Sequence, residues 1–221
     1  MDPYFSKNLT RLVQFIIERK RGGRNDLPSL QDLSDQLGMS VPTLREQIEA
    51  LKVLGVLEAR PRHGVHIRPV DLSDGLTKNA IIAAAFDIQY FYQLSELRDE
   101  IETSWFAPAA KLLDEEDIKH LEKIVLKAEG KLAGKPIQIP YQEHKELHLS
   151  IYKRLDNLFV TGILEAYWTV YESVGMNLYT DLDYQVNVWV FHKEIVHAIK
   201  TKAYQEGQAL LVEHMKLLHN R

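Results

Sequence analysis

The chain has 221 residues, of which 45% are hydrophobic, and its formal net charge is −4. This length suits two compact domains, and the lack of cysteine excludes a disulfide framework and thiolate chemistry. No apolar run approaches the ~18 to 20 residues of a membrane span, and the N-terminus lacks the layout of a signal peptide. We therefore expect a cytoplasmic protein that does not enter membranes.

The charge is unevenly distributed along the chain. Residues 1–70 carry 11 Lys and Arg against 8 Asp and Glu, whereas residues 71–221 carry 16 against 23. A basic segment beside an acidic one favours contact of the N-terminal part with a polyanion such as nucleic acid.

Three helices are expected in the N-terminal part. The first covers residues 5–20, where apolar side chains recur on one helical face. Ser29 can cap a second helix that Gly38 would end. A third helix of about 14 residues, an ordinary length for a globular protein, would begin after Ser40 and end at Gly55.

Two short strands, residues 56–60 and 65–68, are expected to follow and to form a basic hairpin. Helices and hairpin in this order predict a winged helix-turn-helix domain over residues 1–70. Polar side chains at the start of the third helix suit the major groove, and basic groups of the hairpin suit phosphates. The expected DNA contacts are Ser40, Thr43, Arg45 and Gln47 in the helix, and Arg60, Arg62, His63 and Gly64 in the hairpin.

The stretch LPSLQDLSDQLGMS, with Leu44-Arg45-Glu46 after it and the glycine-containing hairpin behind, resembles the DNA-binding domain of the GntR family of bacterial transcriptional regulators. A helix, a glycine and another helix also occur in other small helical domains, but the attached basic hairpin favours the DNA-binding interpretation. Family members usually carry Arg after the serine that starts the recognition helix, where this chain has Val41. One phosphate or base contact is therefore missing, which affects the expected operator sequence and affinity.

The remainder of the chain is expected to be helical. Residues 71–78 follow Pro69 and are rich in Asp, Ser and Gly, a composition that predicts a linker. From residue 79 to 221 there is no period-2 alternation, and helical patterns are separated by breaks at 114–117, 134–140, 155–157 and 180–183. The expected fold class is therefore mainly α, with an all-α antiparallel bundle after the winged helix.

The pattern LRDEIETSWFAPAAKLL, then a histidine-rich helix, then FHKEIVHAIKTKAYQEGQALLVEHM, resembles the FCD-type effector-binding domain of the FadR subfamily of GntR regulators. This resemblance implies a ligand-responsive regulator rather than an enzyme. It also implies a homodimer that binds a palindromic DNA operator, and repression is the favoured mode of action.

Four histidines are candidate metal ligands. His144 and His148 stand four residues apart, so they project from one face of a helix. His192 and His214 are 22 residues apart and would lie on successive antiparallel helices. All four match the FadR-type metal-binding pattern, although the family most often has Asp at position 144. An all-histidine set favours Zn or Ni as the divalent metal cofactor; ordinary buried histidines, or a His144 that bonds to effector or water, are the alternatives.

Arg98 and Asn157 are the candidate effector-binding residues. In FadR-type regulators the corresponding arginine points into the cavity and can hold a carboxylate in a bidentate fork. The alternative for Arg98 is a surface i, i+4 ion pair with Glu102, and Asn157 can equally be a helix N-cap. The expected effector is a small organic acid, and aromatic side chains either line its cavity or belong to the core: Tyr167, Trp168, Tyr171 and Tyr179.

Other functions fit this pattern less well. A metal-dependent hydrolase would use Glu143 or Glu146 as the base for a metal-activated water. It is disfavoured because four protein ligands leave little room for a reactive water and no nucleophile motif is present. A metal-free regulator that binds its effector directly, and an architectural DNA binder whose helical domain only dimerises, are the remaining alternatives.

Overall fold

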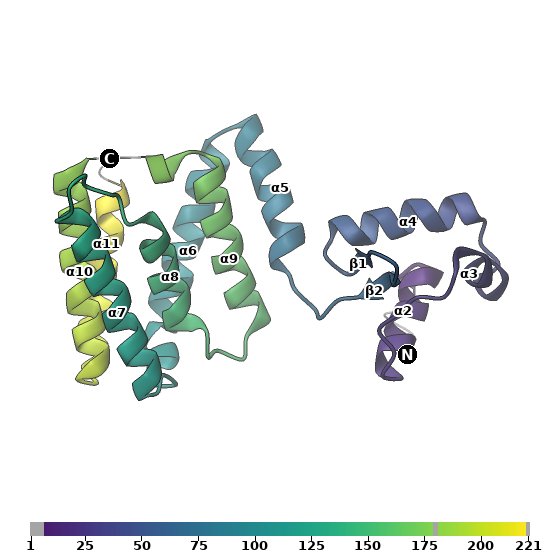
Figure 1. The fold of residues 1–221 in the computed structure, drawn as a ribbon, viewed down its shortest axis with the longest axis horizontal. Coiled ribbons are helices and arrows are strands. Elements are labelled where there is room, and N and C mark those ends of the chain that lie inside the picture. Colours follow the sequence, from purple (N-terminus) through teal and green to yellow (C-terminus); the bar gives the residue numbers. More distant parts are fainter. Residues whose placement is uncertain (1–6, 179–180, 220–221) are drawn as a thin grey trace. The chain divides into compact units, whose positions relative to one another are not determined.

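The computed structural model describes residues 7–178 and 181–219 (Figure 1). The chain divides into two compact units between Gly75 and Leu76. Helices dominate both units and the described residues contain one two-stranded sheet, which confirms the expected mainly-α class. Within the described ranges, no helix combines the length and the apolar character that crossing a bilayer requires.

The three helices of the N-terminal unit are α2 (Arg11–Arg21), α3 (Leu30–Leu37) and α4 (Val41–Val53). Ser29 caps α3 as expected, because its hydroxyl accepts from the Asp32 amide at 3.2 Å. Gly38 ends α3 in the left-handed conformation, with φ 62°. These local contacts place the turn between α3 and α4 where the sequence predicted it.

The first helix is shorter than expected. It begins at Arg11, because the Thr10 hydroxyl accepts from the Val13 amide and so caps the helix there. Residues 7–10 are therefore outside the helix, and residues 5 and 6 of the prediction lie outside the described part of the chain.

The hairpin consists of β1 (Leu57–Arg60) and β2 (Gly64–Ile67), paired antiparallel with Leu57 opposite Ile67. Residues 25–27 lie along the other edge of β2, since the Leu27 amide donates to the Val65 carbonyl at 2.8 Å. The hairpin and three helices enclose one small core: Leu12, Ile16, Leu33, Leu44, Ile48, Leu51, Leu57 and Ile67.

The linker expected at residues 71–78 is largely helical. Helix α5 runs from Ser73 to Phe86, so residues 73–78 belong to it. Asp71 accepts hydrogen bonds from the Ser73 amide (2.8 Å) and hydroxyl (2.7 Å), and Asp74 forms an ion pair with Arg68. Asp71, which looked like a turn residue, thus accepts from the free amide of Ser73 at the start of a helix.

The C-terminal unit is a helical bundle, as expected. Helix α8 packs against α6, α7 and α9, while α10 packs against α7 and α11, and α11 also contacts α6 (Figure 1). The predicted breaks at 114–117, 134–140 and 155–157 fall at helix boundaries or in connections, as do residues 181–183 of the fourth; residue 180 lies outside the described part of the chain. The remaining elements are α6 (Gln89–Ala110), α7 (Glu115–Leu132), α8 (Tyr141–Tyr152), α9 (Leu158–Ser173), η1 (Met176–Leu178), α10 (Leu182–Lys200) and α11 (Tyr204–His219).

Candidate metal centre and DNA-binding surface

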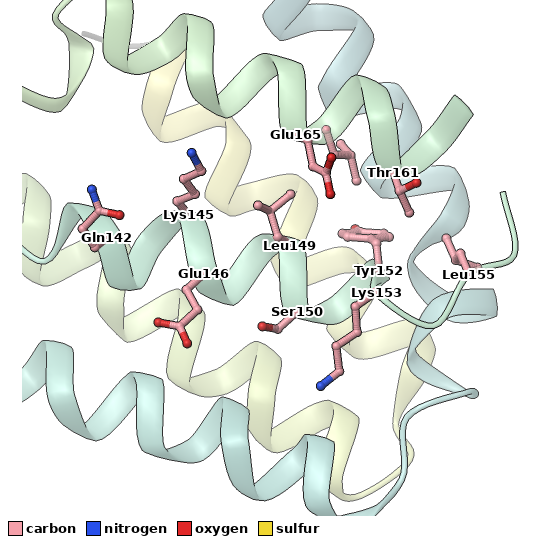
Figure 2. A pocket seen from close by; sticks show the side chains of 11 residues that line it. Gln142, Lys145, Glu146, Leu149, Ser150, Tyr152, Lys153, Leu155, Thr161 and Glu165 are labelled. Atoms are coloured by element: carbon pink, nitrogen blue, oxygen red, sulfur yellow. The ribbon is translucent and has the colours of Figure 1, made fainter. Parts of the chain in front are cut away.

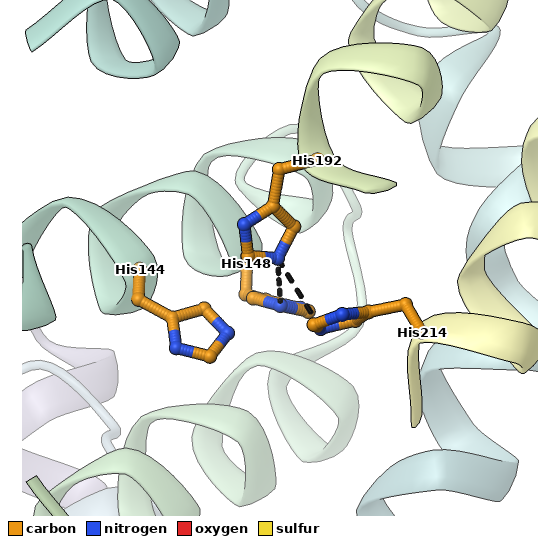
Figure 3. A group of neighbouring side chains, drawn as sticks. All are labelled: His144, His148, His192 and His214. Atoms are coloured by element: carbon orange, nitrogen blue, oxygen red, sulfur yellow. Dashed lines mark hydrogen bonds between the residues drawn. The ribbon is translucent and has the colours of Figure 1, made fainter. Parts of the chain in front are cut away.

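The four predicted histidines come together inside the C-terminal unit (Figure 3). His144 and His148 lie on α8, His192 on α10 and His214 on α11. Each histidine contributes one ring nitrogen that can bind a metal, and these four nitrogens all lie within 4.8 Å of one another. Three helices that are distant in the sequence therefore build one imidazole cluster.

Three of these side chains point their Nε2 atoms toward one another. The Nε2 atom of His192 is 3.2 Å from Nε2 of His148 and 3.2 Å from Nε2 of His214. His144 stands beside them, with its ring centroid 4.7 Å from that of His192 and 4.8 Å from the Trp168 ring (Figure 3). His144 is partly exposed, whereas the other three are buried.

The environment of the cluster favours the neutral form of three of its four imidazoles. Burial lowers the pKa of His148, His192 and His214 well below the usual value. The nearby Arg98 guanidinium lowers all three further, because it is a fixed positive charge. Neutral imidazoles have a free lone pair, which is the form that binds metals.

Arg98 lies against this cluster and not on the surface. It is 3% exposed, its Nε donates to Glu102 Oε1 at 2.9 Å, and Nη1 donates to Asp99 Oδ1 at 3.0 Å. Burial opposes the charge on Arg98, yet the Glu102 carboxylate raises its pKa. Burial likewise raises the pKa of Glu102 while Arg98 opposes that shift. The i, i+4 ion pair with Glu102 is therefore present, but the expected surface location is wrong, since Glu102 is 0% exposed.

The guanidinium also faces aromatic rings and a small cavity. Arg98 lies 5.1 Å from the Tyr167 ring centroid and 5.5 Å from that of Trp168. These residues line a small cavity together with His144, Tyr171, Tyr184, His214 and Met215. The volume that the centre of a water molecule can reach inside it is only about 10 Å³. Three of the four aromatic residues named from the sequence thus border this cavity, and Tyr179 lies outside the described residues.

Asn157 has a different place from Arg98. Its side-chain oxygen accepts from the amides of Phe159 (3.1 Å) and Val160 (3.2 Å), so it is the N-cap of α9. It is absent from the described lining of the cavity beside Arg98. The N-cap alternative therefore accounts for Asn157, and its assignment to effector binding gains no support.

The two glutamates considered as catalytic bases point elsewhere. The Glu143 carboxylate is buried and pairs with Lys127 at 2.8 Å and Lys131 at 2.7 Å. Glu146 pairs with the half-exposed His120 at 3.2 Å. Each carboxylate is thus engaged by residues of α7 and not by the histidine cluster, which leaves the hydrolase hypothesis without its base.

A separate groove of about 620 Å³ runs along α8 and α9 (Figure 2). None of the four histidines belongs to its described lining. Its charged groups are mixed, with Lys145 and Lys153 set against Glu146 and Glu165, so the groove has no preference for one sign of charge.

The expected DNA-contacting residues of α4 lie mostly on its exposed side. Ser40 caps α4, and its hydroxyl is 2.8 Å from that of Thr43. Both side chains are exposed, as is Arg45. Gln47 differs from the prediction, because it is half-buried and its Oε1 atom is shielded from solvent. The turn of α4 after Arg45 carries Gln47 toward the packed side that holds Leu44 and Ile48.

The four hairpin residues predicted to contact DNA are exposed: Arg60, Arg62, His63 and Gly64. The amide of His63 donates to the Arg60 carbonyl at 3.0 Å and closes a tight turn in which Arg62 has φ 65°. Arg60 is paired with Glu58, although its side chain is 57% exposed. A type II turn requires a positive φ at its third residue, where Gly is usual; here an arginine occupies that position at the tip of the hairpin.

Comparison with known proteins decides what the two units are. Residues 10–67 match the family described as bacterial regulatory proteins, gntR family, and residues 93–217 match the FCD domain. The chain belongs to the GntR family. It is a DNA-binding transcriptional regulator with an FCD domain, and its relatives are regulators and not enzymes.

Individual relatives of this GntR regulator are similar in sequence or in fold. An uncharacterized HTH-type transcriptional regulator YcbG of Bacillus subtilis is 23% identical over 96% of this chain and 87% of its own. The solved Streptococcus agalactiae GntR structure has a TM-score of 0.64 and 21% identity, covering 95% of this chain and 96% of the other. For E. coli McbR/YncC the TM-score is 0.52, with 19% identity and 94% of each chain covered.

From the sequence, Glu102 was considered only as a surface partner of Arg98. The buried positions of α6 are 91, 95, 98, 102, 106, 109 and 110, which recur at helical spacing. Arg98 and Glu102 therefore lie on the packed face of their helix together with Phe91 and Phe106. The spacing of these two charges relative to the two phenylalanines is visible in the sequence, and it is the signal that points to a buried pair.

Proposed function

We propose that this GntR regulator senses a small organic acid through a divalent metal ion held by His144, His148, His192 and His214. The observation that carries the proposal is the convergence of three buried Nε2 atoms. Two imidazole nitrogens bound to one ion at about 2.0 to 2.1 Å stand roughly 2.8 to 3.4 Å apart. The two 3.2 Å separations at His192 have that spacing.

The unmet hydrogen-bonding capacity of the cluster also fits a cation. Nε2 of His192 faces two other Nε2 atoms, and one nitrogen can donate at most one proton. The Nδ1 atoms of His192 and His214 are buried and find no hydrogen-bond partner among the described residues. A cation at the convergence point would engage the Nε2 lone pairs together without a shared proton, and the two Nδ1 atoms would then carry the ring protons.

The surrounding charges favour an anionic effector. One positive group, Arg98, and two negative groups, Asp99 and Glu102, lie beside the neutral imidazoles. A divalent ion would leave one positive charge uncompensated, and it would supply a Lewis-acidic position for a carboxylate. The all-histidine set favours Zn or Ni, and His144 completes the set from the more exposed side.

The free cavity is too small for an organic acid, since water centres reach only about 10 Å³ of it. An effector must therefore bind a more open arrangement of the aromatic side chains. Its influence on DNA binding equals its differential affinity for the two arrangements. Because the cavity lies among α6, α8, α9, α10 and α11, binding would shift helices of the bundle.

We further propose that the regulator acts as a homodimer on a palindromic operator, as a repressor, with one winged helix on each half-site. Large apolar side chains of α5 and α6 are exposed, and a second copy can cover them. Phe86 is 85% exposed and Ile82 57%. The others between them and the middle of α6 are Ile88, Tyr90, Tyr92 and Leu97.

Elemental analysis of the purified protein tests the metal site first. Near-stoichiometric Zn or Ni is expected in the wild type and is expected to disappear in a His148→Ala/His192→Ala double variant. The metal-loaded and stripped proteins are then compared in thermal unfolding with a panel of carboxylic acids, and stabilisation is expected only with metal. A wild type that takes up no metal even after reloading contradicts the proposal and leaves the metal-free alternative.

The DNA-binding arm is tested on operator fragments selected from a random library. Arg45→Ala is expected to weaken binding and relax specificity at one base position, because arginine pairs with guanine. Sedimentation of the protein with and without operator gives the number of chains bound. One chain per palindrome, or equal affinity for unrelated DNA, contradicts this part of the proposal.

A further inference from the structure

Two groups compete for the same nitrogen of His148. Its Nδ1 atom is 2.7 Å from Glu102 Oε2 and 2.9 Å from Arg98 Nη2. Arginine can only donate a hydrogen bond, and an ionised carboxylate can only accept one. Nδ1 therefore either carries a proton that it donates to Glu102, or carries a lone pair that accepts from Arg98.

The choice decides what the opposite nitrogen of the ring can do. A neutral imidazole has one proton, so a proton on Nδ1 leaves a lone pair on Nε2, and the reverse holds as well. Nε2 of His148 is the atom that faces His192 Nε2 at 3.2 Å. Only the tautomer with the proton on Nδ1 can present a lone pair to an ion at that position.

The position of Glu102 favours this tautomer. Its contact to Nδ1 is the shorter of the two, and its other oxygen accepts from Arg98 Nε at 2.9 Å. Its backbone carbonyl accepts from the Tyr152 hydroxyl at 2.8 Å, which ties this turn of α6 to α8. The carboxylate is 0% exposed, so water does not compete for its oxygens.

We propose that Glu102 is a positioning residue that holds the proton on Nδ1 of His148 and thereby directs the Nε2 lone pair toward the metal position. Carboxylates that accept from the second nitrogen of a metal-bound histidine fix its tautomer and orientation. The inference rests on the metal site proposed above, which it deepens. Arg98 then has two roles. Its Nε donates to Glu102 and holds that carboxylate in place, and its Nη2, which does not donate to His148 in this tautomer, is available to an effector carboxylate.

The variant Glu102→Gln tests this with almost no change in size. Arg98 Nε must still find an acceptor, so the new amide oxygen would face Arg98 and the amide nitrogen would face His148. That nitrogen donates to Nδ1 and forces the proton onto Nε2, which blocks the lone pair. We expect the affinity for Zn²⁺, measured by competition with a chromophoric chelator, to fall about 10- to 100-fold.

The matched control is Asp99→Asn, which makes the same chemical change on the opposite nitrogen of the same guanidinium. Asp99 accepts from Arg98 Nη1 at 3.0 Å. The control is expected to keep wild-type Zn²⁺ affinity within a factor of about three, and circular dichroism and thermal unfolding establish that both variants fold. Equal losses in the two variants would show that Glu102 acts only through the general charge balance, and would overturn the proposal.

A tautomer measurement on the wild type depends neither on metal nor on the folding of Glu102→Gln. Long-range proton–nitrogen spectra of the metal-free, ¹⁵N-histidine-labelled wild type report which nitrogen of His148 carries the proton, and the resonance is identified by its loss in His148→Ala. A proton on Nδ1 is expected, and a proton on Nε2 overturns the inference. If the wild type binds no Zn²⁺, the metal proposal fails while this spectrum still decides the role of Glu102; if it binds and Glu102→Gln binds equally well, only the inference fails.

Discussion

The two units of this regulator use charge in opposite ways. In the winged helix, Arg45 and Arg62 stand in solvent, and the Arg60 side chain is 57% exposed. In the FCD domain, Arg98 is 3% exposed, Glu102 0% and His148 0%. Exposed charges interact weakly one at a time and are screened by salt, whereas buried charges interact strongly but must be paired.

The difference fits the two kinds of ligand. DNA offers many phosphates, so several exposed cations can add up to useful affinity that falls with salt. An ion or a small acid offers few contacts, so each must be strong and well oriented, which burial provides. Substitutions in the first unit should therefore have graded effects, and substitutions in the second should have large ones.

The largest expected effect comes from His192→Ala. His192 is the histidine whose Nε2 faces two others at 3.2 Å, so its loss removes the centre of the cluster. We expect the affinity for Zn²⁺ to fall by more than about 100-fold, since loss of an outer partner alone costs about 10- to 100-fold. Isothermal titration measures this, and DNA binding without effector should not change.

The control for this prediction is His197→Ala, on the same helix but exposed. It should leave Zn²⁺ affinity unchanged. Equal affinity in wild type and His192→Ala would break the comparison, because buried histidines would then matter no more than exposed ones.

Gly207→Ala tests the packing that carries His214 on α11. A Cβ at this position would meet Phe106 Cε1 at 2.8 Å and Ala198 Cβ at 3.2 Å, so α11 would have to move away from α6 and α10. We expect the free energy of unfolding to fall by about 1 to 3 kcal/mol, measured by urea denaturation.

Its counterpart is Gly130→Ala on α7, where a Cβ would meet nothing within 4 Å. There the loss of unfolded-state freedom should raise the free energy of unfolding by about 0.4 to 1 kcal/mol. Changes of the same sign in both variants would contradict the packing argument.

Asp117→Asn probes a charged contact at the edge of the bundle. Asp117 accepts from the Asp114 amide at 3.0 Å and pairs with Lys153 and Arg154, which join α7 to the end of α8. Although burial opposes its charge, hydrogen bonds from Arg154 and Lys153 lower the pKa of Asp117. The amide oxygen of Asn can still accept from the Asp114 amide, so the variant loses mainly the charge that pairs with Lys153 and Arg154, which should cost about 1 kcal/mol near neutral pH.

The pH dependence has a definite sign. A lowered native pKa stabilises the fold at pH values above the unfolded-state pKa of about 4, and this stabilisation is lost as the pH falls toward the native value. The wild type and Asp117→Asn should therefore converge in stability on acidification, in unfolding curves recorded at several pH values. Glu115→Gln, an exposed change in the same turn of α7, should not alter stability appreciably, and a constant gap for Asp117→Asn at all pH values would count against the assignment.

The smallest effect is expected at the tip of the wing. Arg62→Gly relieves a residue with φ 65° and should stabilise the fold by about 1 kcal/mol. It should also weaken binding to all DNA sequences alike and reduce the salt slope by about one, because a single phosphate contact is lost. Fluorescence anisotropy at several salt concentrations measures this.

Arg62→Lys keeps both the charge and the strained backbone, so it should change neither quantity much. A selective loss for one operator sequence in Arg62→Gly would instead assign base recognition to this side chain, and would make the two units more alike than we infer.

The local sequence was sufficient to predict helix ends where a nearby residue accepts from, or donates to, the free backbone groups of the helix. Ser29, Gly38 and Ser40 bound their helices as predicted, because each cap joins residues only a few positions apart. The same reasoning failed at residues 71–78, where Asp71 and Ser73 begin a helix instead of a turn. Asp and Ser satisfy a free amide in either setting, so their presence alone does not distinguish a linker from a helix start.

The spacing of the apolar residues predicted which face of each helix is buried, but not the burial of every polar side chain beside that face. Leu44, Ile48 and Leu51 are buried as expected, whereas Gln47 beside them is partly buried, because the packed stripe of α4 is wider than its apolar residues alone. On α6 the same rule, applied to Arg98 and Glu102, favours the interior over the surface pair that the i, i+4 spacing suggests.

The sequence by itself determined the winged helix, the helical bundle and the identity of the four histidines, since caps, periodicity and residue type are local properties. Only the tertiary structure decided that His148, His192 and His214 meet at one point and that Glu102 reaches His148 across 46 positions of the chain. Such contacts depend on how α6, α8, α10 and α11 pack, and packing is set by the fit of many side chains at once.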